Sequence, residues 1–391
     1  MSDFDIGTPG NDDDLAALRA ERRRTYNVGA DDAEAWLDRA RRTIDDIRVV
    51  RRGGRIAGGA WLIPMAQWFG GRSVPMTGIG GVGVDPHERA TGAGSALMRS
   101  IVEELHAAGC ALSTLYPATQ PVYRRVGYEI AGSRFVYSIP ANLVDVRDRS
   151  LDIELCDPVT ADALAGMYDD RARSTSGNLD RTERFWERIE YDPKGELQGY
   201  RVNGSSGPEG YVVFTQSGRI KFDLNVRDMV ALTPSAARRL WTFFADHRSF
   251  VDKVTWVGGP GDPFAYHLRE QEWDVDSVAR WMVRVIDVER ALAERGYPAG
   301  LEAEVHLAVA DDVLPRNHAS FVLRVADGKA EVTRGGRGSV KIDVRGLAPL
   351  YTGFLAPQEL VATGYIEGPD EDLARAAAIF AGPAPWLADY F

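Results

Sequence analysis

The feature that most constrains the fold is a junction where an apolar strand pattern changes, through glycines, into a helix pattern. It reads Val82-Gly83-Val84-Asp85-Pro86-His87-Glu88-Arg89-Ala90-Thr91-Gly92-Ala93-Gly94-Ser95-Ala96-Leu97-Met98. A helix start leaves several backbone N–H groups without intrachain partners, and the helix dipole adds positive potential there. Gly92 and Gly94 allow an anion to approach the backbone closely, because they carry no Cβ. The junction therefore predicts a phosphate or pyrophosphate site, with Arg89 adding charge.

Two common phosphate-binding loops do not fit this junction. A dinucleotide-binding loop has the spacing Gly-x-Gly-x-x-Gly and follows the first strand of its domain, whereas these glycines follow several apolar segments. A Walker loop ends in Lys-Ser or Lys-Thr, which does not follow Gly94. Taken alone, the segment is also compatible with a glycine-rich turn that makes only a tight connection.

The alternation of apolar residues predicts an α/β plan. Helices are expected over 11–24, 32–42 and 94–108, and strands over 47–50, 55–63, 73–77, 80–84, 111–116 and 129–139. A second block from residue 151 repeats part of this order. The helix that corresponds to 94–108 begins at Pro234 with Thr233 as its cap, and no glycine-rich loop precedes it. The last hundred or so residues alternate as half-buried strands with helices after them, which indicates an α+β unit with an exposed sheet face.

The junction resembles the Arg-x-x-Gly-x-Gly signature of the GNAT acetyltransferases, preceded by their Val-x-Val-x-Pro strand end. The resemblance implies acetyl-CoA as co-substrate, and the residue spacings lead us to expect no metal. It also implies a bulged strand that splays from the next strand, and we expect Gly83 to permit the bulge. The residues implied around the coenzyme are Val82, Gly83, Val84, Arg89, Ala90, Thr91, Gly92, Ala93, Gly94, Ala118 and Thr119.

A second segment, Pro121-Val122-Tyr123-Arg124-Arg125-Val126-Gly127-Tyr128, resembles the aromatic-Tyr-x-x-x-Gly-Phe/Tyr segment of the same family. The resemblance implies that Tyr123 is the general acid. A thiol has a pKa of roughly 8.5 and a phenol one near ~10, so a phenol can hydrogen-bond to a departing thiolate and then protonate it. We expect Tyr128 to be a packing residue, and Cys110 to lie in the core rather than act as a nucleophile.

The chain ends in a segment that is costly to leave in water. Its proline and aromatic residues are Pro383, Pro385, Trp386, Tyr390 and Phe391. Chain ends in general fray, but a packed tail would bring the free α-carboxylate of residue 391 into the protein.

Over nearly its whole length the chain resembles the Eis (enhanced intracellular survival) family, whose members acetylate aminoglycosides and lysines. The stretches that carry this resemblance are 82–94, the Tyr123 segment, 178–181, 186–188, 230–234, 240–241, 262–263, 350–353 and the terminal Phe391. The resemblance implies a GNAT acetyl-CoA-binding catalytic domain over 1–145, a GNAT-like domain without the coenzyme loop over 146–285 and a sterol-carrier-like domain over 286–391. It further implies the Phe391 carboxylate as general base, and a homohexamer built as a trimer of dimers.

Acidic and aromatic residues are the candidates for contacts with the acceptor amine. They are Trp36, Asp31 and Asp32 near the first helices, and Asp389 near the chain end. We expect acetylation of a primary amine of an aminoglycoside or a related cationic amine, by direct transfer without an acyl-enzyme. Polyamines and protein lysines stay open as acceptors, and so does a non-catalytic lipid- or partner-binding protein with a relic GNAT domain.

Composition narrows the remaining choices. The net charge of −11 disfavours nucleic-acid binding, and the two cysteines, Cys110 and Cys156, lack the spacing of a metal site or disulfide framework. No apolar run approaches the ~18–20 residues that cross a bilayer, and the first residues are acidic rather than basic. We therefore expect a cytoplasmic protein without nucleic-acid or membrane partners.

Overall fold

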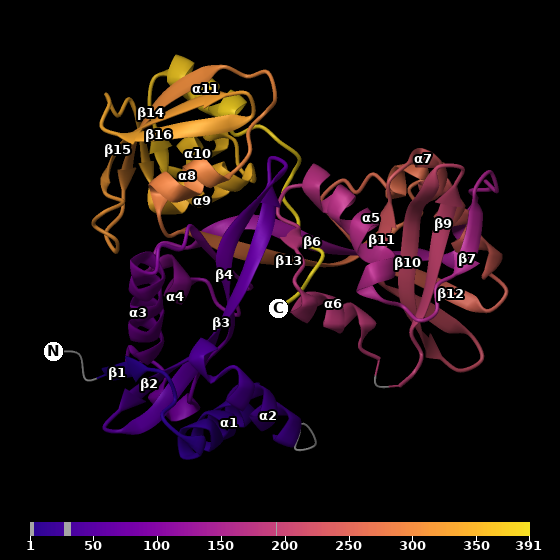
Figure 1. Ribbon diagram of the computed structural model, residues 1–391, viewed down its shortest axis with the longest axis horizontal. Coiled ribbons are helices and arrows are strands. Elements are labelled where there is room, and N and C mark those ends of the chain that lie inside the picture. The colour runs from indigo at the N-terminus through magenta and orange to yellow at the C-terminus, as the bar shows by residue number, and fades with distance from the viewer. Residues whose placement is uncertain (1–3, 27–32, 193) are drawn as a thin grey trace.

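The chain is organised as three packed units in sequence order, which run from indigo to yellow in Figure 1. The computed structural model describes residues 4–26, 33–192 and 194–391. The described strands form a large sheet shared by the first two units and a five-stranded sheet in the third. The predicted class is confirmed: two α/β units with mixed sheets flanked by helices, followed by an α+β unit.

The first unit has helices on both faces of its strands. Its elements are β1 (Phe4–Gly7), α1 (Asp12–Tyr26), α2 (Ala33–Arg42), β2 (Ile47–Arg52), β3 (Arg55–Phe69), β4 (Arg72–Val84), α3 (Ala93–Ala107), β5 (Leu112–Leu115), α4 (Pro121–Arg124) and β6 (Glu129–Pro140). Side chains alternate across β3, so Trp61 packs in one buried cluster with Leu18 of α1, while Leu62 packs in another with Leu97 of α3. This arrangement places α1 and α3 on opposite faces of the sheet.

The strands β3 and β4 are longer than the sequence predicts. Strands were expected over 55–63, 73–77 and 80–84, whereas β3 runs to Phe69 and β4 is one continuous strand. The two extensions pair with each other around a turn at Gly70 and Gly71, which have φ of +59° and +80°. Glycines inside β4 look like breaks in sequence, but within the fold they are places where other groups approach the strand.

The central unit repeats the order of the first. Its elements are β7 (Asp152–Leu155), α5 (Ala161–Ser174), β8 (Leu179–Asp180), α6 (Glu183–Glu190), β9 (Gln198–Gly204), β10 (Gly207–Gly218), β11 (Phe222–Ala231), α7 (Pro234–Asp246), β12 (Val251–Gly258) and β13 (Asp274–Val285). An antiparallel pair, β10 and β11, leads into α7 and then into β12, which is parallel to β11. The antiparallel pair β3 and β4 leads in the same way into α3 and the parallel strand β5.

The first two units exchange strands. The sheet order runs β4-β5-β13-β6-β12-β11, so the last strand of the central unit lies between β5 and β6 of the first. Sequence reasoning missed β13, because its first half is largely exposed and its second half fully buried, which gives no regular alternation. The domain limits near 145 and 285 stay a prediction from chain order, since the sheet itself continues from one unit to the next.

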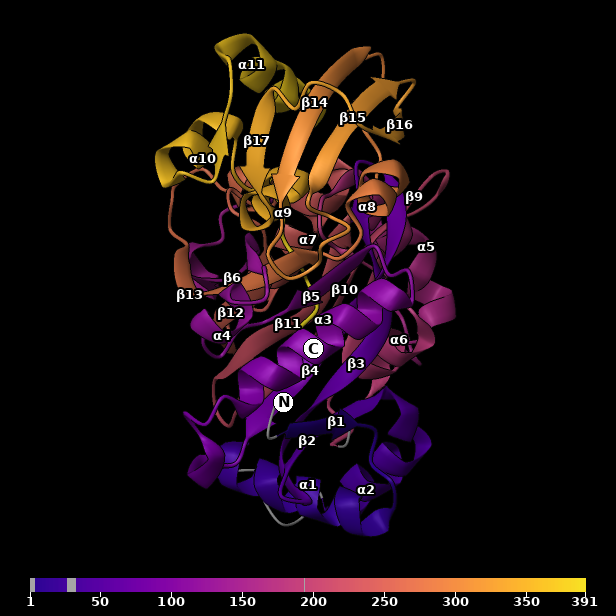
Figure 2. The same ribbon diagram turned by 90° about the vertical axis from the view of Figure 1, so that its left-hand side faces the viewer.

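The third unit has the five-stranded sheet order β16-β15-β14-β17-β18. Its elements are α8 (Val288–Glu294), β14 (Ala303–Ala310), β15 (Ala319–Ala326), β16 (Lys329–Arg334), β17 (Val340–Asp343), α9 (Val344–Thr352), α10 (Pro357–Thr363), β18 (Ile366–Glu367) and α11 (Asp370–Ile379). Figure 2 shows this sheet at the end of the molecule away from α1 and α2. Helix α9 packs on β6 and β13, so the third unit rests directly on the exchanged strands.

Candidate active site

A gap opens between β4 and β5. The two strands pair in parallel from Met76 only as far as Gly78, which lies opposite Thr114, although β4 continues to Val84. The register of β4 with β3 shifts between Gly80 and Gly83, and Gly81 has a φ of +56°. The bulge therefore lies at Gly81 and the following residue, which corrects the expectation that Gly83 would provide it.

Helix α1 covers the bulge from one face. The Arg22 side chain donates from Nη1 to the carbonyl oxygen of Gly81 at 2.8 Å, and the Tyr26 hydroxyl donates to the carbonyl oxygen of Val82. A Cβ at Gly83 would lie 2.6 Å from a carboxylate oxygen of the buried Glu21. Gly81 and Gly83 are thus required because α1 approaches the strand here. Sequence reasoning missed Glu21, Arg22 and Tyr26, although several glycines within one strand signal such close contact.

The loop after β4 presents unused N–H groups. The first helical bond of α3 runs from Ala96 to the carbonyl oxygen of Gly92 at 2.9 Å. Within the described part of the chain, the N–H groups of residues 92–95 have no hydrogen-bond partner, and Arg89 is exposed without an ion pair. Ala90 and Gly92 have φ of +62° and +99°, and such left-handed residues turn successive N–H groups into an anion-binding concavity.

This geometry fits the pyrophosphate of acetyl-CoA. The group is anionic, and it needs the converging donors and positive potential that a helix N-terminus supplies. A left-handed alanine costs about 1–2 kcal/mol, so the loop keeps Ala90 in this conformation against its intrinsic preference. Ala118 and Thr119 lie in the exposed loop between β5 and α4, which follows the strand on the other side of the gap.

Tyr123 has a hydroxyl that is free to donate. Its side chain is buried to 4% exposure in the cluster around α3, and its hydroxyl has no hydrogen-bond partner among the described residues. Burial raises the pKa of Tyr123 above its ordinary value, so the phenol holds its proton at neutral pH. Tyr128 differs, since its fully buried hydroxyl donates to the Ser113 hydroxyl at 2.7 Å, as expected of a packing residue.

Cys110 does not have the features of a nucleophile. Burial raises the pKa of its thiol, and the thiol donates to the carbonyl oxygen of Leu112 at 3.0 Å. A protonated, hydrogen-bonded thiol is a weak nucleophile. Its place at the entrance of β5 agrees with the predicted structural role.

The C-terminal tail leaves the third unit, passes β6 and ends between the first and central units (Figure 1). Trp386 forms a parallel bridge with Ser133 of β6, and the N–H of Leu387 donates to the Ser133 carbonyl oxygen at 3.2 Å. Further on, Arg134 donates to the carbonyl oxygen of Ala388 at 3.1 Å. The tail is therefore fixed along the exchanged strand β6 and does not fray.

The terminal residue lies at the point where β4 and β5 separate. The Phe391 ring is 5.5 Å from the Tyr116 ring and 6.5 Å from the Phe185 ring, measured between centroids. A Cβ at Gly78 would lie 3.1 Å from this ring, so the glycine provides room for it. The α-carboxylate of Phe391 has no hydrogen-bond or ion-pair partner among the described residues.

The predicted acceptor residues do not form one group. Asp389 is 8% exposed, and its carboxylate accepts from Arg181 Nε at 3.1 Å, while Arg181 also pairs with Asp228 at 2.5 Å. This geometry makes Asp389 an anchor of the tail rather than a free contact for an amine. Trp36 stands edge-on to the Trp61 ring at 5.4 Å. Asp31 and Asp32 lie outside the described residues.

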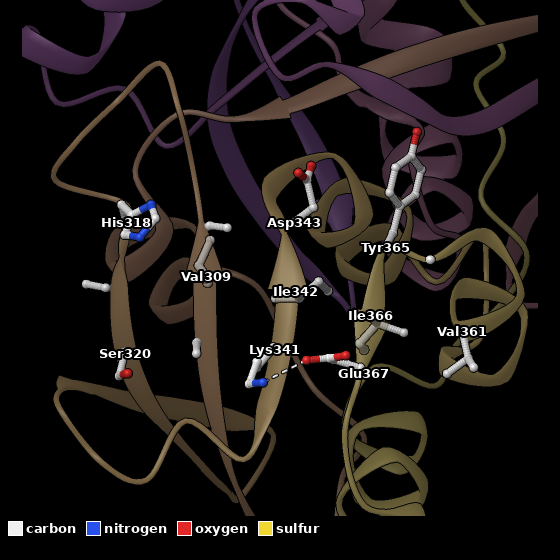
Figure 3. A pocket seen from close by; sticks show the side chains of 14 residues that line it. Val309, His318, Ser320, Lys341, Ile342, Asp343, Val361, Tyr365, Ile366 and Glu367 are labelled. Atoms are coloured by element: carbon white, nitrogen blue, oxygen red, sulfur yellow. Dashed lines mark hydrogen bonds and ion pairs between the residues drawn. The ribbon is translucent and has the colours of Figure 1, made fainter.

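The third unit carries a separate open groove of about 640 Å³ beside its sheet (Figure 3). It is lined by Ala308, Val309, Ala310, His318, Ala319, Ser320, Lys341, Ile342, Asp343, Val361, Gly364, Tyr365, Ile366 and Glu367. Lys341 and Glu367 form an exposed ion pair across it at 2.8 Å. The Tyr365 hydroxyl, beside the groove, donates to Glu129 of β6 at 3.1 Å, and Glu129 also pairs with Arg124 of α4, so the groove borders the first unit.

Two further observations concern metals and membranes. The described ranges contain no group of three or more His, Cys, Asp or Glu side chains placed to hold a metal ion. Among the helices of those ranges, none combines the length and apolar character that crossing a bilayer requires.

Comparison with known proteins identifies the three units. Residues 9–131 and 177–285 each match the acetyltransferase (GNAT) domain, and residues 288–388 match the sterol carrier protein domain. A Streptomyces coelicolor protein described as an uncharacterized N-acetyltransferase is 28% identical over 81% of both chains.

Solved structures resemble the chain over its whole length. A GCN5-related N-acetyltransferase from Anabaena variabilis is 38% identical with a TM-score of 0.94, covering 99% of this chain and 100% of that one. The corresponding protein from Kribbella flavida is 31% identical with a TM-score of 0.88, covering 99% and 98%. Eis1 from Mycobacterium abscessus shares the fold, with 24% identity, a TM-score of 0.82 and coverage of 99% and 100%. The chain therefore belongs to the GCN5-related N-acetyltransferases, with the Eis-like order of two GNAT domains and a sterol carrier protein domain.

Proposed function

We propose that the enzyme transfers the acetyl group of acetyl-CoA directly to a primary amine of an aminoglycoside or a related small cationic amine. Tyr123 acts as the general acid and the Phe391 carboxylate as the general base. The observation that carries this proposal is the position of the chain end: a packed tail brings an unpartnered carboxylate to the place where β4 and β5 separate. A carboxylate at this point attracts a cationic amine and lies next to the proposed coenzyme gap.

The coenzyme contacts follow from the loop and the splayed strand. When bound, acetyl-CoA supplies an activated thioester. The open N–H groups of residues 92–95 and the Arg89 guanidinium hold its pyrophosphate, with Ala90 and Thr91 shaping the loop. The backbone of Val82, Gly83 and Val84 lines the gap on one side, and the loop with Ala118 and Thr119 lies on the other.

Proton transfer uses two groups of opposite character. A terminal carboxylate has an ordinary pKa of ~3.5, far below that of an ammonium group near ~10, so it accepts a proton only where desolvation makes it more basic. The aromatic rings of Tyr116, Phe185 and Phe391 border the chain end and exclude water from one side of it, whereas the Arg188 guanidinium, which donates to the Tyr390 carbonyl oxygen at 3.0 Å, opposes the rise in basicity. The protonated phenol of Tyr123 gives its proton to the coenzyme thiolate as it leaves.

The acceptor side is built around aromatic rings. Trp36 and Trp61 stand together, and the Arg22 guanidinium lies 4.6 Å from the Trp61 ring. Aromatic faces stabilise cations, and because Arg22 already occupies the Trp61 ring, we propose Trp36 as the ring that contacts the substrate amine. The resemblance to Eis proteins supports a homohexamer, and the two unpaired cysteines support a reducing, cytoplasmic location.

The position of the terminal carboxylate provides the decisive test. Adding one glycine after Phe391 moves the carboxylate away while keeping the ring, and we expect turnover to fall by roughly 10²-fold or more. Phe391→Leu keeps the carboxylate at its place and serves as the control, with turnover mostly retained. Acetyl-CoA binding, measured by calorimetry, should be unchanged in both. Full activity of the extended enzyme would remove the tail from the mechanism.

The acceptor itself is tested by a thiol-release assay. Kanamycin-type aminoglycosides, spermidine and lysine peptides are compared at equal concentration with the wild-type enzyme. The proposal expects the highest kcat/KM for an aminoglycoside. A clear preference for the peptides would instead assign the enzyme to protein lysines.

A further inference from the structure

The segment that carries Tyr123 has little support of its own. Helix α4 is a single turn of four residues, and within the described chain its N-cap residue, Gln120, makes no side-chain capping bond. A helix this short is marginal by itself, because most helical stability in proteins comes from packing against other elements. The Tyr123 hydroxyl has no partner among the described residues, so no hydrogen bond at that end fixes the ring. The position of Tyr123 therefore depends on what holds α4 and the turn after it.

The first support is the carboxylate of Glu129 at the start of β6. Glu129 is 5% exposed, and its carboxylate accepts from Nε of Arg124 at 3.0 Å and from Nη2 at 2.6 Å. Two donors of one planar guanidinium restrict its orientation as well as its distance. Because Arg124 is the residue after Tyr123, this ion pair ties α4 to the start of β6.

Tyr365 of the third unit completes this support. Its hydroxyl donates to the Glu129 carboxylate at 3.1 Å, and Figure 3 shows its ring pointing away from the groove. Burial and the charge of Glu129 raise the pKa of Tyr365, so the hydroxyl keeps its proton and donates at neutral pH. The ring is held on α9: the Arg345 guanidinium lies 4.8 Å from its centroid, and a Cβ at Gly346 would lie 2.6 Å from the Cβ of Tyr365. We call the bonded series Arg124–Glu129–Tyr365 the Glu129 contact.

A second support holds the turn between α4 and β6. Arg284 of β13 is fully buried and donates from Nε to the carbonyl oxygen of Val126 at 2.8 Å. Its Nη2 pairs with the Asp311 carboxylate of the third unit at 2.7 Å, and both side chains are fully buried. A Cβ at Gly127 would lie 2.7 Å from Arg284 Nε, so the glycine lets the guanidinium reach the turn. We call the series Val126–Arg284–Asp311 the Arg284 contact.

Apolar packing joins the same two regions. Leu314 of the third unit lies in the buried cluster that contains Tyr123 and Val126. The Leu314 N–H donates to the Asp311 carboxylate at 3.0 Å. The carboxylate that pairs with Arg284 therefore also fixes the loop through which the third unit enters this cluster.

We propose that the third unit positions Tyr123 as the general acid, through the Glu129 contact and the Arg284 contact. This rests on the proposed function, in which Tyr123 protonates the leaving thiolate. A proton donor has to lie within hydrogen-bond distance of its acceptor, and small displacements lower the rate steeply. The members of the two contacts are positioning residues, because they act through the backbone around Tyr123 rather than on the substrate. The third unit then serves both ends of the proton transfer: its tail carries the base, and its two contacts hold the acid.

Tyr365→Phe removes one hydroxyl, keeps the ring and is tested in two backgrounds. In the otherwise wild-type enzyme, turnover should fall roughly three- to tenfold, with the acetyl-CoA dissociation constant unchanged. The acceptor used is the one with the highest kcat/KM among kanamycin, spermidine and a lysine peptide. In the Tyr123→Phe background the same substitution should not change turnover, because the proton donor that it displaces is already absent.

The two backgrounds separate positioning from a general structural role. An equal loss of turnover from Tyr365→Phe in both backgrounds would overturn the positioning and leave the acid role of Tyr123 intact. Full turnover of Tyr123→Phe alone would instead refute the acid role in the proposed function, and the positioning with it.

Two further variants serve as control and second probe. Tyr297→Phe removes another buried hydroxyl bond of the third unit, to the carbonyl oxygen of Leu292 at 2.6 Å, and should leave turnover unchanged. Arg124→Lys keeps the charge but loses the paired donors, and it should lower turnover only while Tyr123 is present. A loss in Tyr297→Phe equal to that in Tyr365→Phe would count against the proposal.

Backbone amide exchange tests the same idea without an acceptor. Residues 121–128 should exchange roughly fivefold faster or more in Tyr365→Phe than in the wild type, because local opening of α4 becomes easier. In Tyr297→Phe they should exchange at the wild-type rate. Wild-type exchange of this segment in Tyr365→Phe would contradict the proposal even where every acceptor is poor.

Discussion

The two GNAT units differ most at the start of the helix that follows the splayed strand. In the first unit, left-handed backbone at Ala90 and Gly92 precedes α3, and among the described residues the N–H groups of 92–95 at its start have no hydrogen-bond partner. In the central unit, the Thr233 hydroxyl caps α7, and Pro234 at the first helical position carries no N–H. Both units have the same strand order and the same bulge-and-splay geometry. The residues at the helix start therefore decide whether the N–H groups there are open to a phosphate, as at α3, or capped, as at α7.

The two units also hold the tail differently. The central unit uses charge, through the buried pairs of Arg181 with Asp389 and Asp228. The first unit uses aromatic contact, with Tyr116 stacked on Tyr390 at 4.4 Å and its hydroxyl bonded to the Asp389 carbonyl oxygen at 3.0 Å. The charged pairs of Arg181 fix the position of the tail, and the rings of the first unit pack against its last two residues.

The largest expected effect tests this division of the tail contacts. Arg181→Gln leaves two buried carboxylates without their cation and should lower the free energy of unfolding by about 3–5 kcal/mol. Tyr116→Phe removes one hydroxyl bond and should cost only about 1 kcal/mol. Urea denaturation of both variants measures the difference. Similar losses in the two would show that charge does not dominate the anchoring.

The next effect concerns the two tyrosines that follow the first coenzyme loop. Tyr123→Phe removes the proposed proton donor and should lower turnover roughly 10²-fold or more, with acetyl-CoA binding intact. Tyr128→Phe is the matched control, because its hydroxyl bonds to Ser113 and should affect stability by about 1 kcal/mol rather than turnover. Steady-state kinetics and calorimetry separate the two. Unchanged turnover in Tyr123→Phe would exclude it as the acid.

A third test changes one residue at each helix start. Gly92→Ala places a side chain at a φ of +99°, and its cost of about 1–2 kcal/mol should weaken acetyl-CoA binding about tenfold. Thr233→Ala removes the cap of α7 and should lower stability by about 1 kcal/mol without changing acetyl-CoA affinity. The comparison of the two junctions fails if Thr233→Ala weakens acetyl-CoA binding to the same extent.

The smallest effect is a pH dependence of stability, which we expect from the contact between Asp148 and Arg238 of α7. Hydrogen bonds from Ser150 and Arg238 lower the pKa of Asp148 to about 2, below its ordinary value near 3.8. A lowered pKa stabilises the fold at pH values above the ordinary pKa, and this stabilisation is lost as pH falls towards 2. Asp148→Asn should therefore cost about 1 kcal/mol at pH 7, with the side chain's partial exposure limiting the effect. Thermal melts should show that the difference in Tm between the wild type and Asp148→Asn decreases as the pH falls from 4 to 2.

Local rules in the sequence accounted for the elements that face the site. Val82–Met98 predicted the strand, loop and helix, because helix starts and glycines have local geometric requirements. The start of α7 at Pro234 was predicted for the same reason, as was the end of α3 before Gly109, whose φ is +72°. The left-handed conformation of Ala90 was not predicted, because an alanine side chain does not favour it.

Contacts between distant residues were beyond such rules. Arg22 and Tyr26 reach the bulge of β4 because α1 packs over glycines that lie more than fifty residues later. Asp389 is a second long-range case: it was expected to contact substrate, but its carboxylate pairs with Arg181 of the central unit. In each case the partner is chosen by the packing of elements, which short-range patterns do not encode.

The sequence alone determined that a helix begins at an anion-binding loop, that a second unit lacks this loop, and that the tail is too apolar to stay in water. Each of these depends on backbone conformation or hydration that a few neighbouring residues decide. The tertiary structure alone decided that β13 inserts between β5 and β6 and that the tail follows β6 to Gly78. Strand partners and the route of the tail depend on which buried surfaces fit together, and this is a property of the whole chain.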